Sequence, residues 1–175
     1  MKNELKKKIF IDPGSQGRPG WYPVPPADPD LLFYIQRNQN QDAIVYQVNR
    51  TPEGLINDHL PMDAYWMRFS AGGERRELNE YQSRLAYGYE SNKISSELYA
   101  FQFVSYHDMT FYINKLDKTS AYRVVYQEDG KNIALNNIYV YALEFGVFPD
   151  VKYIEFFGTD LESNAEHYKK ILIEP

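Results

Sequence analysis

The sequence predicts a mainly β protein, a single-domain antiparallel β-sandwich or barrel of about eight to nine strands with one α-helix at about residues 74–87. Two observations support this. The chain of 175 residues contains 16 Tyr and 10 Phe, an excess of aromatic residues, which favour strands. Its apolar and polar residues alternate in short runs separated by turn-forming residues, the pattern of half-buried strands. A sheet of this size must curl or pack on a second sheet to bury its apolar face.

The first 30 residues differ in composition from the rest of the chain. They contain three glycines and six of the ten prolines, and proline lacks the amide hydrogen that a regular ladder needs. We predict an extended arm over residues 1–30, held against the domain by Trp21 and Tyr22, and a single β-rich domain over residues 31–175. The alternative function for the arm is docking to a partner with an aromatic groove.

Residues 31–49 predict a hairpin. In its first arm Phe33 and Ile35 fall on one face of a period-two strand. The polar run at residues 38–42 predicts the turn, because Asn and Asp side chains hydrogen-bond their own backbone. A third strand is predicted at residues 62–69.

One segment shows the helical period. Its apolar residues recur at spacings of three and four, namely Leu78, Tyr81, Leu85 and Tyr89. Gly88 is placed to end the helix. We therefore predict three helical turns at about 74–87, with one apolar stripe that lies across a sheet or at the end of a barrel.

From residue 97 onward the period returns to two. The predicted strands are 97–104, 110–116, 121–127, 132–145 and 151–157. Asp129-Gly130 predicts a tight hairpin turn, because both residues readily adopt positive φ. Asn136-Asn137 predicts a bulge or a second turn, and we expect further turns at His107-Asp108 and at 148–150. Residues 162–173 suit a helix or a closing strand, and their apolar end favours the strand.

Composition excludes some classes of site. The chain has no cysteine, which rules out disulfides, thiolate metal sites and cysteine nucleophiles. Its net charge is −5, which argues against nucleic-acid binding because that needs a concentrated basic surface. No run reaches the ~20 apolar residues of a membrane helix. The sequence as written predicts a cytoplasmic protein, and export with a trimmed leader is an equal alternative.

Few residues are placed for catalysis or metal binding. The spacings of His59, His107 and His167 never match two zinc ligands on one helix. No Gly-x-Ser-x-Gly motif of serine hydrolases occurs. We predict no metal and no cofactor. The alternative is an enzyme of unrecognised type, which would use His107 or a carboxylate pair, Glu144 with Glu155, as acid and base.

Arginine and aromatic residues within strands are the candidate ligand-binding residues. Arg37, Arg68 and Arg123 lie in or at the end of apolar runs, and two inward-pointing guanidinium groups would hold a carboxylate or phosphate. Trp66 and Tyr112 belong to the aromatic surplus, whose rings either line a cavity or fill the core. The alternative for the arginines is a structural ion pair with a nearby carboxylate.

Four segments together resemble a known family. They are FYIQRNQNQDAIVYQVN at 33–49, AYWMRF at 64–69, LAYG at 85–88 and YIEFFGTDL at 153–161. The family that they resemble is an uncharacterised bacterial one, known only as a domain of unknown function, and the resemblance spans about residues 22–175. It implies no catalytic or binding residue. It does imply export, because members of the family often look exported.

Three hypotheses for function follow. The first is a non-enzymatic binding module for a small amphipathic or anionic ligand or a protein partner, which would use the arginine and aromatic residues named above. The second is the enzyme of unrecognised type. The third is a structural or assembly protein, which would form a homo-oligomer through a sheet edge or an aromatic patch.

Overall fold

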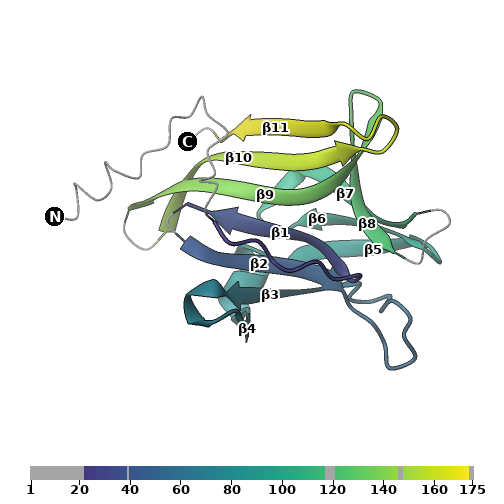
Figure 1. Cartoon of the computed structure of the whole chain (residues 1–175), viewed down its shortest axis with the longest axis horizontal. Coiled ribbons are helices and arrows are strands. Elements are labelled where there is room, and N and C mark those ends of the chain that lie inside the picture. The colour runs from purple at the N-terminus through teal and green to yellow at the C-terminus, as the bar shows by residue number, and fades with distance from the viewer. Residues whose placement is uncertain (1–21, 39, 117–120, 146–147, 174–175) are drawn as a thin grey trace.

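A computed structural model describes residues 22–38, 40–116, 121–145 and 148–173, with backbone alone at 144, 145 and 148. The chain is mainly β, and its strands form one curled open sheet, a half-barrel (Figure 1). The strands are β1 (Leu31–Arg37), β2 (Asn40–Val48), β3 (Met62–Arg68), β4 (Glu74–Glu77), β5 (Tyr89–Ser95), β6 (Leu98–Phe103), β7 (Tyr106–Lys115), β8 (Tyr122–Glu128), β9 (Lys131–Phe145), β10 (Phe148–Asp160) and β11 (Glu166–Leu172). A 3₁₀ turn, η1 (Phe69–Ala71), and the helix α2 (Glu80–Leu85) complete the described elements. None of the described helices is long and apolar enough to cross a membrane.

Strand β9 joins the two halves of the sheet. Its residues 131–134 pair antiparallel with β8, and its residues 137–140 pair in parallel with β1. Since β10 occupies the opposite edge of β9, β1 and β8 share one edge. Between the two pairings, Asn136 is an extra residue opposite the step from Phe157 to Gly158, which confirms the predicted bulge. The parallel pairing of β1 with β9 corrects the prediction of a wholly antiparallel sheet.

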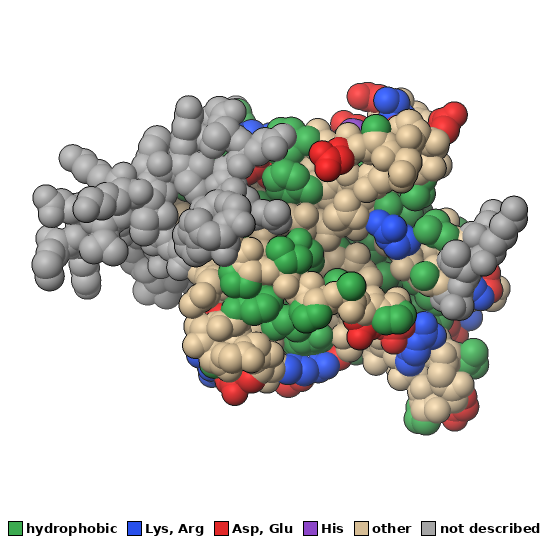
Figure 2. Space-filling model, viewed as in Figure 1, with side chains coloured by type: hydrophobic (Ala, Val, Ile, Leu, Met, Phe, Trp, Pro, Cys, Tyr) green, Lys and Arg blue, Asp and Glu red, His purple; other side chains and the backbone are tan. Residues whose placement is uncertain are grey.

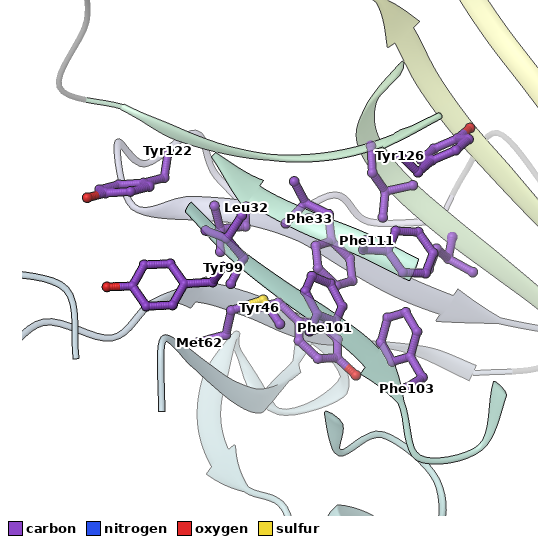
Figure 3. Close-up of a cluster of buried hydrophobic side chains, with 14 of the residues drawn as sticks. Leu32, Phe33, Tyr46, Met62, Tyr99, Phe101, Phe103, Phe111, Tyr122 and Tyr126 are labelled. Atoms are coloured by element: carbon purple, nitrogen blue, oxygen red, sulfur yellow. The ribbon is translucent and has the colours of Figure 1, made fainter. Parts of the chain in front are cut away.

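The core lies between two arms of the sheet, β1–β4 and β5–β8. Figure 1 shows the second arm behind the first, and Figure 3 shows the aromatic side chains that meet between them. Phe33 of β1 stacks on Tyr46 of β2, with ring centroids 4.3 Å apart. Its ring also lies edge-on to Phe103, at 6.0 Å. Phe101 stacks on Phe111 at 5.3 Å, so aromatic contacts run from one arm to the other.

Tyrosine hydroxyl groups connect the arm β5–β8 to β3 and to the loop that precedes β3. The Tyr89 hydroxyl accepts a hydrogen bond from Met62 N (2.8 Å) and donates one to Met62 O (2.6 Å). The Tyr99 hydroxyl donates to the Asp58 carboxylate (2.5 Å), which also contacts Lys93 Nζ (2.8 Å). Both contacts lower the pKa of Asp58, and the contact with Lys93 has the larger effect. Side chains thus join strands that share no ladder.

The helix is shorter than predicted. Residues Glu74–Glu77 form β4, which pairs with β3, and the helix begins only after Asn79. The Asn79 side chain accepts from Gln82 N, and the Gln82 side chain accepts from Asn79 N, a reciprocal capping box. This local arrangement sets the start of the helix.

The predicted apolar stripe of the helix is wrong. Tyr81 and Leu85 are 54% and 60% exposed, because a helix of six residues covers little of the sheet. Gly88 follows the helix for a different reason than predicted. A Cβ atom on Gly88 would lie 1.7 Å from the Ser83 carbonyl oxygen, so the chain passes where only glycine fits.

The strand prediction is confirmed in outline and corrected in detail. The turn at Asp129-Gly130 is confirmed by φ values of 49° and 75°, and residues 162–173 contain strand β11. The predicted turns at His107-Asp108 and at 148–150 are wrong, since these residues belong to β7 and β10. Two mainly exposed strands, β4 and β5, were not predicted, because polar residues show no apolar alternation. They bring the number of strands in the described ranges to eleven.

The outer face of β1 and β9 is covered by the chain that precedes β1. Tyr22 is 5% exposed, and its ring lies 6.3 Å from that of Tyr139. The Gln36 side chain donates to Pro23 O (2.7 Å). Trp21 lies outside the described residues. On the face shown in Figure 2, acidic and basic side chains are scattered among hydrophobic ones.

Tyr139 is fully buried, and its hydroxyl group has no hydrogen-bond partner among the described residues. Burial raises the pKa of Tyr139 far above its ordinary value of 10.0, and nearby tyrosines and Glu155 add to the effect. Burial likewise raises the pKa of Tyr89 and Tyr126. The folded protein therefore holds these groups neutral at pH values where the unfolded chain ionises.

Replacing Tyr89 by Phe should destabilise the protein. The change leaves Met62 N and O without their partner, and each unsatisfied buried group costs roughly 1–3 kcal/mol. Urea denaturation at pH 7 would measure the loss in free energy of unfolding. The control is Tyr81→Phe, on the exposed helix, for which we expect a change within about 0.5 kcal/mol. Equal stability of the two variants would contradict the bridging role of Tyr89.

Raising the pH above 10 should unfold the protein progressively. Each tyrosine with a raised folded pKa stabilises the fold fully below its unfolded pKa of 10.0. That contribution is lost as the pH rises from there toward the folded pKa, by about 1.4 kcal/mol per pH unit for each group. The measurement is urea denaturation between pH 8 and pH 11.

Tyr139→Phe isolates one such group. The hydroxyl that it removes has no partner in the described structure, so stability at pH 7 should be unchanged or slightly higher. Above pH 10, the free energy of unfolding of this variant should fall less steeply with pH, by the contribution of one tyrosine. An unchanged slope would show that Tyr139 does not ionise on unfolding in this range.

Candidate functional site

An apolar groove opens on the concave side of the half-barrel. It has a volume of about 580 Å³. One wall comes from the inner faces of three adjacent strands, with Ile138 and Val140 from β9, Ile154 and Phe156 from β10, and Ile171 from β11. Alternate residues of β9 face the other way, into the tyrosine cluster around Tyr139. The period-two pattern of β9 and β10 therefore produces an apolar concave surface.

Another part of the lining is the segment from Leu85, the last residue of the helix, to Tyr87. The Tyr46 hydroxyl donates to Tyr87 O (2.6 Å), and the Ser105 hydroxyl donates to Ala86 O (2.7 Å). The rings of Tyr87 and Trp66 meet edge to face, with centroids 5.7 Å apart. Burial raises the pKa of Tyr46 well above 10.0, so its hydroxyl remains a donor at neutral pH. This part of the lining is held in place by these contacts.

The rim of the groove carries one positive and one negative side chain. Arg37 lies at the end of β1, on the same face as Phe33 and Ile35, and Asp108 lies near the start of β7. Tyr106 lies beside Asp108, and its pKa is raised by burial and then by that carboxylate. The groove thus combines an apolar interior with a charged entrance.

A second, polar pocket of about 280 Å³ lies at the end of the sheet where β1 ends at Arg37. It is lined by Asn40 and Asp42 of β2, Trp66 and Arg68 of β3, Arg76 and Glu77 of β4, and Asn79 and Gln82 at the start of the helix. Arg68 is 3.9 Å from the Asp42 carboxylate and 3.3 Å from that of Glu74. The Trp66 indole nitrogen donates to Gln82 Oε1 (3.3 Å).

The structure distributes the five predicted ligand-binding residues over three places. Trp66 and Arg68 line the polar pocket, and Arg37 lines the apolar groove. Because β1 and β3 both run antiparallel to β2, Arg37 and Arg68 lie at the same end of the sheet. Arg123 and Tyr112 lie together elsewhere, on the outward face of β8 and β7.

Arg123 donates to the Asn136 side chain (3.0 Å), and burial lowers its pKa. Tyr112 lies opposite Val125, one diagonal step from Arg123. Neither residue lines the groove or the polar pocket. The strand alternation that turns Phe111 inward turns Tyr112 outward.

The three histidines lie at separate places in the fold. His107 is exposed on β7, His59 is exposed in the loop before β3, and His167 Nδ1 lies 3.3 Å from the Tyr126 hydroxyl. Within the described ranges, no three His, Asp or Glu side chains gather as metal ligands would.

The carboxylate pair of the enzyme alternative is separated by the register of β9 and β10. Glu155 is fully buried opposite Tyr139 and accepts a hydrogen bond from the Tyr168 hydroxyl. Glu144 lies opposite Pro149, five residues further along β9, and its side chain is outside the described residues.

Sequence reasoning missed several residues that line these two sites. The sequence predicts a turn at Asp108, although this residue lies on β7 and lines the groove. It predicts Arg76 within the helix, whereas the residue lies on β4. The spacing Asn79-x-x-Gln82 is a recognisable capping signal that would have moved the start of the helix past Arg76.

Comparison with known proteins identifies one family. The family model described as Domain of unknown function (DUF4833) matches residues 33–170, and the resemblance seen in the sequence to a domain of unknown function is thereby confirmed. No curated protein and no solved structure matches the chain.

Proposed function

The chain belongs to the family described as Domain of unknown function (DUF4833), and from the geometry of its groove we propose that it is a non-enzymatic binding protein for a small amphipathic anion. The ligand's apolar chain lies along β9, β10 and β11. Its anionic group lies at the rim, beside Arg37.

The size and lining of the groove support this proposal. A volume of about 580 Å³ lies within the range of roughly 300–1,000 Å³ that is typical of small-molecule sites. Leu85 lines the groove and is 60% exposed. Covering such side chains with an apolar ligand removes apolar surface from water, which favours binding by about 25 cal/mol per Å².

Arg37 supports the choice of an anion. Its guanidinium group offers paired donors that match a carboxylate or phosphate. Asp108, the other charged residue of the lining, disfavours a second negative group on the ligand. A ligand with one anionic end and one apolar chain therefore fits this charge pattern best.

We also propose that the half-barrel is an open form of the predicted barrel rather than a sandwich. Its support is the single hydrogen-bonded path of strands from β4 to β5. The Tyr89 bridge between β5 and Met62 brings the two ends of this path together.

Decanoate is a suitable test ligand, and Arg37→Gln should weaken its binding about tenfold or more. A hydrogen bond to a charged group contributes about 1.5–3 kcal/mol, and 1.4 kcal/mol corresponds to tenfold. NMR chemical-shift titration would measure the dissociation constants of decanoate and of decan-1-ol, and the alcohol should be little affected. The control is Arg123→Gln, on the outward face of β8. Failure of decanoate to bind the unaltered chain would overturn the proposal.

Replacing Leu85 by Gln should weaken the binding of both decanoate and decan-1-ol by about three- to tenfold, because apolar contact with the ligand is lost. Leu85 is exposed, so the fold should be retained. Leu161→Gln provides the matched control, since Leu161 is also exposed and does not line the groove. The same titration applies, and equal affinity of the two variants would place the ligand elsewhere.

A further inference from the structure

The polar pocket next to the groove presents mainly hydrogen-bond donors. Its amide oxygen atoms accept hydrogen bonds from the protein. Each of its two carboxylates, Asp42 and Glu77, also has a protein donor, and Glu77 Oε1 accepts from Arg75 Nε (2.6 Å). Asn40 Oδ1 accepts from Asp42 N (2.9 Å), and the Asp42 carboxylate accepts from the Ser70 amide and hydroxyl groups (2.9 and 2.8 Å). Asn79 Oδ1 accepts from Gln82 N (2.8 Å).

The Gln82 side-chain oxygen also accepts hydrogen bonds from the protein. Its Oε1 atom accepts from Asn79 N (3.0 Å) and from the Trp66 indole (3.3 Å). Because these partners are N–H donors, they determine which side-chain atom of each amide is the oxygen. The remaining amide nitrogens, those of Asn40, Asn79 and Gln82, are donors.

Arg76 adds a positive charge to these donors. It lies on β4 directly opposite Trp66, and its side chain makes no hydrogen bond or ion pair with any residue that the structure describes. Its neighbour Arg75 differs, since it binds the Glu77 and Asp63 carboxylates at 2.6 and 2.7 Å and lies 4.1 Å from the centre of the Tyr65 ring. Alternation along β4 therefore separates a paired arginine from an unpaired one.

From this donor set we propose that the polar pocket is a binding site for a small hydroxylated ring that carries one anionic group, such as a sugar carboxylate or a sugar phosphate. The anionic group accepts from Arg76. Ring hydroxyl oxygens accept from the amide groups, and the ring lies against Trp66. The volume of about 280 Å³ suits a ligand of one ring.

The site is separate from the apolar groove and does not depend on the function proposed for it. Trp66 lines the polar pocket, and its ring contacts that of Tyr87, which lines the groove. The two sites thus share a wall but offer opposite chemistry. A ligand that matches the chemistry of one site does not match that of the other.

The test uses the emission of Trp66. The chain has two tryptophans, so Trp21→Phe leaves Trp66 as the only one. Glucuronate, glucose 6-phosphate and glucose are titrated into this protein. A saturable change with either anionic sugar, at least about tenfold tighter than with glucose, supports the site, and the two anions distinguish a carboxylate from a phosphate ligand. No saturable change, or equal affinity for glucose, overturns it.

Arg76→Gln and Arg75→Gln, each in the Trp21→Phe protein, form a matched pair. We expect Arg76→Gln to weaken binding of the anionic sugar about tenfold or more. Arg75→Gln should change its dissociation constant less than twofold. Equal effects of the two changes would overturn the role of Arg76. Decanoate binding serves as the fold control, because Arg76→Gln should leave it unchanged. If decanoate does not bind, the NMR spectrum reports folding, and the result for the sugar site stands alone.

Discussion

The hydrogen bonds of β9 with β1 and β8, along one edge of the strand, hold the two arms of the sheet together. The strand reaches both partners because its first residues pair with β8, and the residues beyond Asn136 pair with β1. The extra residue at Asn136 separates the two pairings, as bulges do where a strand bends. Without this shared edge the arms would be separate sheets with no common interior.

The interior between the arms is filled mainly by aromatic rings. Phe33 and Tyr46 belong to one arm, and Phe101 and Phe111 belong to the other. Rings of this size span the gap between curved sheets with few side chains, which explains the high aromatic content of a small domain. The tyrosines at the margin of this core extend their hydroxyl groups to backbone atoms, as Tyr46 does at Tyr87 and Tyr89 at Met62.

The same arrangement produces the two candidate sites. Aromatic rings fill the core between the arms, but at the end of β1 the concave surface of β9 to β11 stays open as the apolar groove. The segment from Leu85 to Tyr87 separates this groove from the polar pocket at the ends of β2, β3 and β4. Both sites therefore lie at the end of the sheet that holds Arg37 and Arg68.

The sequence by itself determined the β class, the tight turn at Asp129-Gly130 and the bulge near Asn136. These depend on local dihedral preferences and on alternation within a single strand. It also selected Trp66 and Arg68, which the fold brings into one pocket. Polar edge strands such as β4 were missed, because exposed residues carry no apolar pattern.

Only the tertiary structure decided which strands are neighbours. The pairing of β1 with β9 joins residues about a hundred positions apart, and no local signal encodes it. The register of β9 and β10 separates Glu144 from Glu155, and strand alternation turns Arg123 and Tyr112 away from Arg37. The groove and the donor-rich pocket exist only once these long-range pairings place their walls together, because each wall comes from a different part of the chain.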